Sequence, residues 1–204
     1  GVIIVATSNW PPERLYEGGL QRDRFLPFID LLKRRLEIIH LDGPTDYRTQ
    51  FLQEEGTYFF PLGDATRKKA DDLFAHLTDG TPAQSETLTV KGREIVIPAA
   101  AKNVARVTFQ DLCEKPLGAE DYLAIARRYR TVFLENIPKM AYDRRNEAKR
   151  LMTLIDALYE SRTRLIVTAD APADRLYYGH DHAFEFERTV SRLLEMQSVA
   201  YFQV

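Results

Sequence analysis

Short apolar runs that end in polar turns constrain the fold of this chain more than any other feature of its sequence. The run GVIIVA at residues 1–6 is continuous and β-branched, which is typical of a strand covered on both faces. Further strands are predicted at residues 36–41, 131–134 and 164–168, with helical patterns between them. Because strands that alternate with helices form parallel sheets, the sequence predicts an α/β fold.

Helical patterns fill the intervals between these strands. We expect a short helix at residues 12–19 and a longer one that becomes regular at Pro27. Asp64 and Asp143 are predicted to cap two further helices, because their carboxylates accept hydrogen bonds from free backbone N–H groups. Apolar residues at helical spacing would face inward from these two helices: Leu73, Phe74 and Leu77, and then Leu151, Leu154, Ile155 and Leu158. The remaining patterns predict helices at 119–129 and 186–196.

The sequence between residues 86 and 109 has a different character. LTV and EIVI flank a hairpin signal around Gly92, and VARVTF follows as a third predicted strand. We interpret this stretch as a small antiparallel β insertion. The predicted organisation is therefore a parallel core with a lid-like helix over 1–78, the insertion over 79–112, and a carboxyl-terminal α/β extension over 113–204.

Two segments of the chain resemble each other. Residues 4–16 read IVATSNWPPERLY and residues 165–177 read LIVTADAPADRLY, aligned without a gap. This similarity predicts one strand–turn–helix unit used twice, so that the extension would be a decayed repeat. The alternative is that two strand ends converged on similar turn residues. The polar residue in the turn after the strand differs, since Asn9 in the first segment is matched by Asp170 in the second.

Composition excludes several classes of function. The formal net charge is -2, from 28 basic and 30 acidic residues, so we expect no nucleic-acid partner unless basic residues gather on one face. Cys113 is the single cysteine, so no intrachain disulfide forms, and we interpret it as a small core residue. No apolar run reaches the roughly 18 residues of a membrane helix.

Asn9 is the first candidate for chemistry. It follows a predicted buried strand, and open parallel sheets bind ligands at the carboxyl ends of their strands. A site that hydrolyses a nucleotide needs a neutral polar group to orient the attacking water, and an amide both donates and accepts hydrogen bonds. The alternative is a purely local turn before Pro11.

Arginines form the second group of candidates. Arg22 and Arg24 precede an apolar helix, and a guanidinium supplied to a neighbour's phosphates would neutralise charge that develops on the transferred group. The alternative is that both are solvated residues beside Asp23. Arg48 and Arg145 are weaker candidates for contacts with a nucleotide.

The remaining polar motifs favour structural interpretations. Glu135 ends an apolar strand, as the acid of a degraded Walker B motif would. After the second of the two similar segments, Arg188 and Arg192 would then correspond to Arg22 and Arg24. We prefer the interpretation that Glu135 is an acid at the end of a strand without a catalytic role. His180 and His182 flank an aspartate without a recognisable third ligand, so no metal site is predicted.

Several motifs in a fixed order resemble a known family. VATSNWPPERLYEGGLQRDRFLPFIDLL resembles the sensor-one and arginine-finger stretch of the ZapE and AFG-one-like P-loop ATPases. The resemblance continues through HLDGPTDYR, FQDLCEKPLGAEDYLAIARRY, TVFLENIP, NEAKRLMTLIDALY and FERTVSRLLEMQS, and so covers nearly the whole chain. It implies a partial AAA-type P-loop fold, with Asn9 at the sensor-one position and Arg22 or Arg24 at the finger position. We favour Arg24, which directly precedes the helix-anchoring Phe25.

The same resemblance implies ATP and Mg²⁺ as cofactors, held by Walker A and B motifs that precede the sensor-one strand. No G-x-x-x-x-G-K-[ST] occurs in the 204 residues, so this chain alone is not expected to hydrolyse ATP. Because Gly1 is not a methionine and strand character begins at once, we interpret the amino end as a cut. The motifs would then lie in an upstream half of the same protein, the first expected partner.

The implied function is ATP turnover coupled to cell division or to the handling of membrane-associated proteins. An arginine that acts on a neighbouring subunit requires an oligomer, here a homo-oligomer. By resemblance, the expected client is a protein such as the division-ring protein FtsZ, with peripheral membrane association left open. The expected location is the bacterial cytoplasm, or the matrix side of mitochondria for a eukaryotic protein. The alternative from another class is a non-catalytic protein-interaction module.

Overall fold

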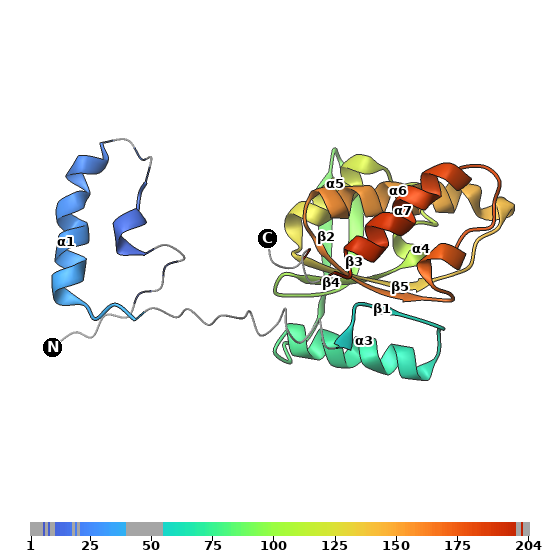
Figure 1. Ribbon diagram of the computed structural model, residues 1–204, viewed down its shortest axis with the longest axis horizontal. Coiled ribbons are helices and arrows are strands. Elements are labelled where there is room, and N and C mark those ends of the chain that lie inside the picture. Colours follow the sequence, from blue (N-terminus) through green and yellow to red (C-terminus); the bar gives the residue numbers. More distant parts are fainter. Residues whose placement is uncertain are drawn as a thin grey trace. The chain divides into compact units, whose positions relative to one another are not determined.

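The computed structural model describes residues 6, 8, 11–17, 19, 21–39, 55–198 and 201. The chain divides into two compact units, Gly1–Pro44 and Thr45–Val204. Figure 1 shows the elements of each unit, coloured along the sequence. The predicted strand at the start of the chain lies outside the described residues.

The first unit contains one regular helix, α1 (Leu26–Arg35), with Pro27 in its first turn. Two 3₁₀ turns precede it, η1 (Pro12–Arg14) and η2 (Arg22–Arg24). The helix predicted at residues 12–19 is wrong in length, because the chain leaves helical geometry at Leu15 (φ -58°, ψ 133°). The strand predicted from Leu36 is also wrong over residues 36–39, which pair with no described strand and leave Ile39 71% exposed.

The second unit is built on one six-stranded sheet with the order β1-β6-β5-β4-β3-β2. Its strands are β1 (Tyr58–Phe59), β2 (Gln84–Val90), β3 (Arg93–Ala101), β4 (Val104–Thr108), β5 (Thr131–Ile137) and β6 (Arg164–Ala169). The strands β1, β6, β5 and β4 are parallel to one another, whereas β4–β3 and β3–β2 are antiparallel. The predicted parallel pairing of β5 with β6 is confirmed, with Phe133 opposite Ile166.

The three strands between residues 84 and 108 extend the same sheet. The β2–β3 turn contains Lys91 and Gly92, both at positive φ (48° and 80°), which is the backbone that the hairpin signal predicts. β4 then pairs in parallel with β5, so residues 79–112 and 113–204 contribute to one hydrogen-bonded layer. The antiparallel part is thus joined edge-on to the parallel part.

Helices cover both faces of this sheet, as Figure 1 shows. One face carries α5 (Ala119–Arg128), α6 (Arg145–Glu160) and α7 (Ala183–Glu195), together with the short α4 (Phe109–Leu112). The other face carries α3 (Asp64–Leu77). Both predicted caps are displaced by one residue. Gly63 is the N-cap of α3, and Arg144 is the N-cap of α6 because Asp143 lies in the 3₁₀ turn η3 (Tyr142–Arg144).

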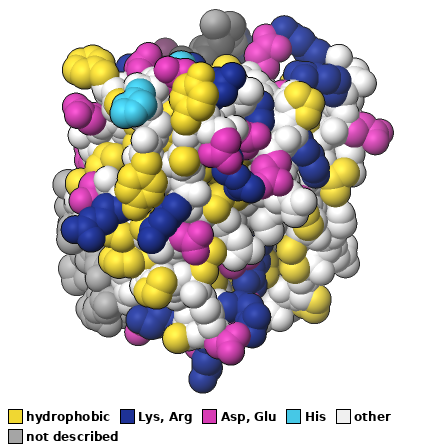
Figure 2. Space-filling view, turned by 90° about the vertical axis from the view of Figure 1, so that its right-hand side faces the viewer, with side chains coloured by type: hydrophobic (Ala, Val, Ile, Leu, Met, Phe, Trp, Pro, Cys, Tyr) yellow, Lys and Arg dark blue, Asp and Glu magenta, His cyan; other side chains and the backbone are white. Residues whose placement is uncertain are grey.

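The surface carries charges of both signs. Figure 2 shows the side that lies to the right in Figure 1, where hydrophobic, basic and acidic side chains lie among one another. Exposed aromatic residues of the second unit include Tyr142, Tyr178 and Phe184, the last 84% exposed. This mixture agrees with the near-neutral composition of the chain.

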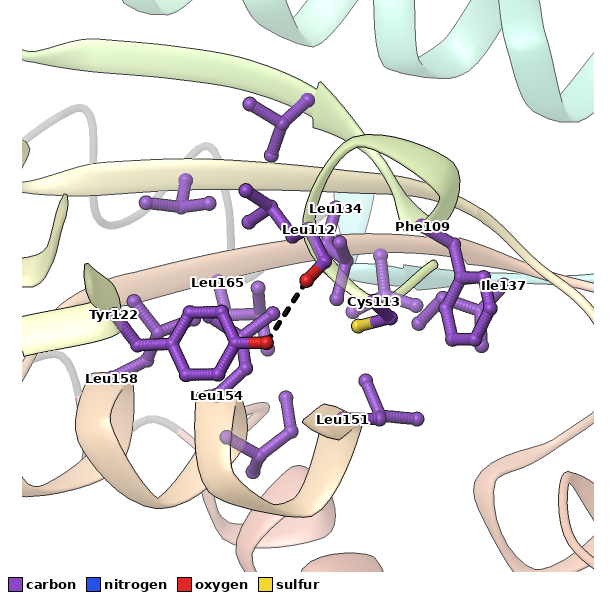
Figure 3. Close-up of a cluster of buried hydrophobic side chains, with 14 of the residues drawn as sticks. Phe109, Leu112, Cys113, Tyr122, Leu134, Ile137, Leu151, Leu154, Leu158 and Leu165 are labelled. Carbon is purple, nitrogen blue, oxygen red and sulfur yellow. Dashed lines mark hydrogen bonds between the residues drawn. The ribbon is translucent and has the colours of Figure 1, made fainter. Parts of the chain in front are cut away.

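The two faces of the sheet explain why its central strands are continuously apolar. Val132 and Leu134 of β5 pack in the larger core with α5, α6 and α7, whereas Phe133 between them packs in the smaller core with α3. The ring centroids of Phe133 and Phe74 lie 5.5 Å apart. In the larger core (Figure 3), the buried Tyr122 donates a hydrogen bond to the Leu112 carbonyl at 2.9 Å. Each strand residue therefore needs an apolar side chain, whichever way it points.

The two similar segments share local geometry where both are described. η1 and η4 (Ala173–Arg175) occupy matching positions, and the preceding Pro11 and Pro172 have nearly the same backbone angles (φ -62°, ψ 154° and φ -59°, ψ 155°). A ring contact follows each turn, Tyr16–Phe25 at 5.5 Å and Tyr177–Phe186 at 5.2 Å. They differ at the next leucine, since Leu176 is fully buried and Leu15 is not. The shared strand stays a prediction, because residues 4, 5 and 7 of the first segment lie outside the described residues.

Candidate functional site

The candidate finger arginines lie on η2, directly before α1. Gln21 has a left-handed backbone (φ 56°) that turns the chain into η2. Phe25 then contacts both Tyr16 and Phe28, with ring centroids 5.5 Å and 5.2 Å apart. These aromatic contacts fix the carboxyl end of η2, so the direction of the two arginines is set by packing rather than by a flexible loop.

The two arginines differ in what they contact. Arg22 is half-buried, and its Nη2 donates to the Glu13 carbonyl. Its Nε is buried with no hydrogen-bond partner among the described residues. The Arg24 side chain is exposed and forms no hydrogen bond or ion pair with any other residue that the structure describes. Arg22 therefore links η1 to η2, while the Arg24 guanidinium is available to an outside group.

Of the other three predicted site residues, only Arg145 lies among the residues that the structure describes. Asn9 and Arg48 lie outside the described residues, so their roles stay predictions. Arg145 is the first residue of α6, and its guanidinium lies 4.7 Å from the centre of the Tyr142 ring. A cation over an aromatic face is an adequate structural role for this arginine.

Glu135 is held by an ion-pair cluster. Arg106 on the neighbouring β4 donates to both Glu135 carboxylate oxygens at 2.8 Å and also contacts Asp71 of α3 at 2.6 Å. Burial alone would lower the pKa of Arg106, but the hydrogen bonds and charges of Glu135 and Asp71 outweigh it and raise that pKa. This bidentate geometry supports the interpretation of Glu135 as a strand-end acid. Arg106 was not among the residues predicted from the sequence.

The polar turn after β6 also has structural contacts. The Thr168 hydroxyl accepts a hydrogen bond from the Asn136 N–H at 2.9 Å, and Asn136 has a positive φ of 60°. Asp170 donates through its backbone N–H to the Ile137 carbonyl at 2.9 Å. These contacts hold the irregular end of β5, where its register with β6 shifts.

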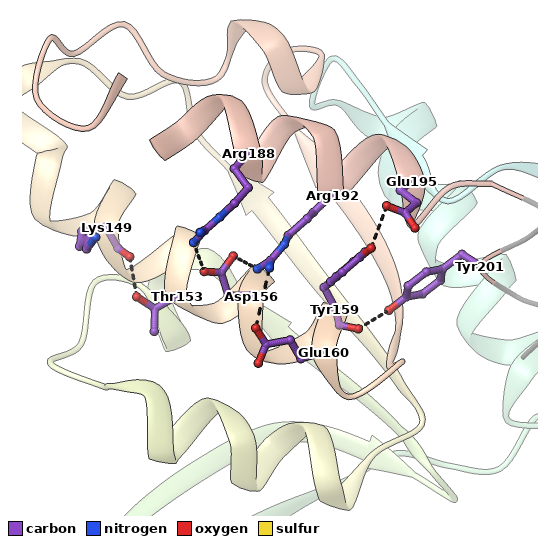
Figure 4. Close-up of polar contacts among 9 residues, drawn as sticks. All are labelled: Lys149, Thr153, Asp156, Tyr159, Glu160, Arg188, Arg192, Glu195 and Tyr201. Carbon is purple, nitrogen blue, oxygen red and sulfur yellow. Dashed lines mark hydrogen bonds and ion pairs between the residues drawn. The ribbon is translucent and has the colours of Figure 1, made fainter. Parts of the chain in front are cut away.

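The arginines of α7 join this helix to α6 (Figure 4). Arg188 and Arg192 both contact the Asp156 carboxylate, and Arg192 also lies 3.7 Å from Glu160. Tyr159 donates to Glu195 at 2.8 Å from the same helix pair. Both arginines therefore have intramolecular partners, which disfavours a second finger at these positions.

No cluster of three metal-ligating side chains occurs in the part of the chain that the structure describes. His182 lies 3.7 Å from Glu185, and the Tyr177 hydroxyl donates to the Asp181 carbonyl, so the H-D-H segment has local partners. Cys113 is fully buried, and burial raises the pKa of its thiol, which fits the predicted core role. Among the described helices, none is long and apolar enough to cross a membrane.

A layered α/β sheet with parallel central strands is consistent with the P-loop ATPase class. The model of the AFG1-like ATPase family matches residues 1–204. The chain belongs to this family, as the motifs predict.

Known proteins agree with this assignment. The chain is 38% identical over 203 residues to the cell division protein ZapE of Escherichia coli K12, covering 100% of the chain and 54% of that relative. It is 36% identical over 237 residues to the lactation elevated protein 1 homolog B of Danio rerio, covering 99% of the chain and 47% of the relative. The chain thus spans about half the length of these relatives. No solved structure matches it significantly.

Proposed function

We propose that this chain belongs to an ATP-hydrolysing enzyme in which Arg24 acts on the nucleotide of a neighbouring subunit. The observation that carries the proposal is the difference between the two η2 arginines. The exposed Arg24 side chain has no hydrogen-bond or ion-pair partner among the described residues, whereas the Arg22 side chain donates to the Glu13 carbonyl. A finger must reach outward, and a guanidinium already used within its own unit is poorly suited to that role.

Two further features support this role for Arg24. The packing of Phe25 against Tyr16 and Phe28 fixes the residue next to the arginine, so less side-chain and backbone freedom is lost when the guanidinium engages a phosphate. Family membership supplies the chemistry, because a catalytic arginine in trans is a recurring part of phosphoryl transfer. ATP and Mg²⁺ would be held by the upstream half of the intact protein, with Asn9 placing the attacking water.

Subunit mixing tests the proposal in the intact ATPase. Arg24→Ala should lower ATP turnover by a factor on the order of 10³, with nucleotide affinity nearly unchanged, because the finger acts on the transition state. Assemblies that mix Arg24→Ala subunits with subunits impaired in nucleotide binding should regain activity, since intact arginines then face intact sites. Turnover is measured across mixing ratios.

The matched control is Arg34→Ala, which removes the same charge from the exposed surface of α1 in the same unit. It should retain full turnover. Failure of mixed assemblies to regain activity, with the Arg24→Ala protein still folded and oligomeric, would exclude an action in trans. An equal loss in Arg34→Ala would reduce the effect to general electrostatics.

The cellular role follows from the relatives as a proposal. The Escherichia coli relative is a cell division protein, so we infer that ATP turnover is coupled to division or to membrane-associated protein handling. A homo-oligomer follows from the finger mechanism, and a division-ring protein such as FtsZ is the proposed client. The bacterial cytoplasm is the corresponding location.

One observation favours a second candidate, a protein-interaction module. The segments after β5 and β6 run side by side, because Tyr178 donates its N–H to the Met140 carbonyl at 2.8 Å. Tyr142 and Tyr178 on these segments are 53% and 57% exposed, and exposed aromatic residues are frequent at interfaces. Replacing both tyrosines with serine should leave ATP turnover intact and weaken client binding if this surface docks the client.

A further inference from the structure

A pocket of about 570 Å³ lies at the amino ends of the parallel strands, opposite the edge where open α/β sheets bind nucleotides. Three turns form it: residues 102–104 between β3 and β4, residues 126–131 between α5 and β5, and residues 161–164 between α6 and β6. Its size falls in the range of small-molecule sites. The sheet topology brings these three turns together from distant parts of the sequence.

The lining of this pocket is strongly cationic. Five of its residues carry a positive charge and none carries a carboxylate: Lys102, Arg127, Arg130, Arg162 and Arg164. Lys102 has an acidic partner outside the lining, Asp79. Arg127 and Arg130 are exposed and have no ion pair or side-chain hydrogen bond with any described residue. On a chain of net charge -2, this is a local concentration of positive charge.

Backbone hydrogen bonds join the turns that carry these cations. The Asn103 carbonyl accepts from the N–H groups of Arg130 and Thr131, at 2.9 and 3.2 Å. The Arg164 N–H donates to the Arg130 carbonyl at 2.9 Å. Arg162 stacks over Tyr201, with its guanidinium 5.4 Å from the ring centre. The backbones of the three turns are therefore joined to one another, which keeps like charges close together. An anion between these charges would offset their mutual repulsion.

We propose that this pocket binds a small anion that carries two or more linked phosphate groups. The guanidinium forks of Arg127 and Arg130 suit phosphate oxygens, and several linked phosphates would offset the combined charge of the lining. A small ligand is favoured over a nucleic acid because the cations lie in a concave pocket and the chain as a whole is not basic. This proposal does not rest on the proposed function, because residues of the second unit alone line the pocket.

Calorimetric titration of the 204-residue chain with inorganic tripolyphosphate tests the proposal. We expect saturable binding that weakens as salt is raised, because the contacts are charged. Arg127→Gln and Arg130→Gln should each lower the affinity by roughly tenfold, as expected for a lost hydrogen bond to a charged group. Titration with ATP distinguishes the two sources of linked phosphates. Equal affinity for ATP and tripolyphosphate would mean that the phosphates alone are recognised, and tighter binding of ATP would identify the ligand as a nucleoside polyphosphate. Both results support the site.

The control variant is Lys68→Gln, which removes one exposed charge from α3 outside the pocket. It should bind tripolyphosphate like the unchanged chain, and circular dichroism should show all three variants folded. The proposal is overturned if millimolar tripolyphosphate does not bind, or if Lys68→Gln loses as much affinity as the arginine variants. It is also overturned if single-stranded oligonucleotides bind more tightly than tripolyphosphate and gain affinity with length, which would assign a nucleic-acid surface.

Discussion

At the scale of single residues, Glu135 shows how a sequence motif that resembles a catalytic one can have a structural role. Its side chain is 13% exposed and is bound by Arg106, which also contacts Asp71 and lies 5.7 Å from the centre of the Phe74 ring. The cluster joins β4, β5 and α3 across the smaller core. We therefore expect its loss to lower stability rather than to remove an activity.

Glu135→Ala should lower the free energy of unfolding by about 3 kcal/mol, because it leaves the half-buried Arg106 guanidinium poorly compensated. Urea denaturation of the 204-residue chain measures the change. The double variant Arg106→Met with Glu135→Leu should regain most of the loss, since apolar side chains of similar size need no charged partner. Equal destabilisation in the single and double variants would contradict the ion-pair explanation.

At the scale of elements, the contact between α6 and α7 depends on a few charged residues as well as on apolar packing. Asp156 on α6 contacts both Arg188 and Arg192 of α7 (Figure 4). Asp156→Asn should weaken this attachment and lower stability by about 1 kcal/mol, because the pairs are partly exposed. Hydrogen exchange of the α7 amides should accelerate. Glu187→Gln, on an exposed position of α7, is the control and should leave exchange unchanged.

The central strands were predictable because they are covered on both faces, which produces an unbroken apolar run whatever the tertiary details. The helix caps were not, since Asp64 and Asp143 have cap-forming side chains but Gly63 and Arg144 take the N-cap positions. The apolar residues from Leu36 to Ile39 predicted a strand as those of β5 did, but these residues pair with no strand that the structure describes. The pocket cations were missed because only the strand order brings their three turns together.

At the scale of the whole molecule, buried tyrosines are expected to lower the stability of the second unit at alkaline pH. Burial raises the pKa of Tyr201 to about 12, against a smaller opposite effect from Arg162, and burial also raises the pKa of Tyr58, Tyr122 and Tyr129. Below pH 10 these hydroxyls are protonated in both the folded and the unfolded chain. Above it, only the unfolded chain loses their protons readily, so the free energy of unfolding falls as pH rises.

For Tyr201 this loss should approach about 1.4 kcal/mol per pH unit between pH 10 and 12. Urea midpoints at pH 9, 10 and 11 measure the fall for the chain. Tyr201→Phe should be less stable at pH 9, because the hydroxyl donates to the Thr163 carbonyl at 3.2 Å, but it should lose less stability between pH 10 and 11. The same pH dependence in both proteins would exclude a contribution from this residue.

The position of β1 has a consequence for the order of folding. Its residues pair with β6 across more than a hundred positions of sequence, Tyr58 opposite Val167, whereas β2 and β3 meet through a two-residue turn. Closing a long loop loses more conformational entropy than closing a hairpin does. The pairing of only two residues in β1 offsets this larger loss. We therefore expect the meander from β2 to β4 to form early on the folding pathway and β1 to dock late. In the folded chain, the same edge should be the first part of the sheet to open.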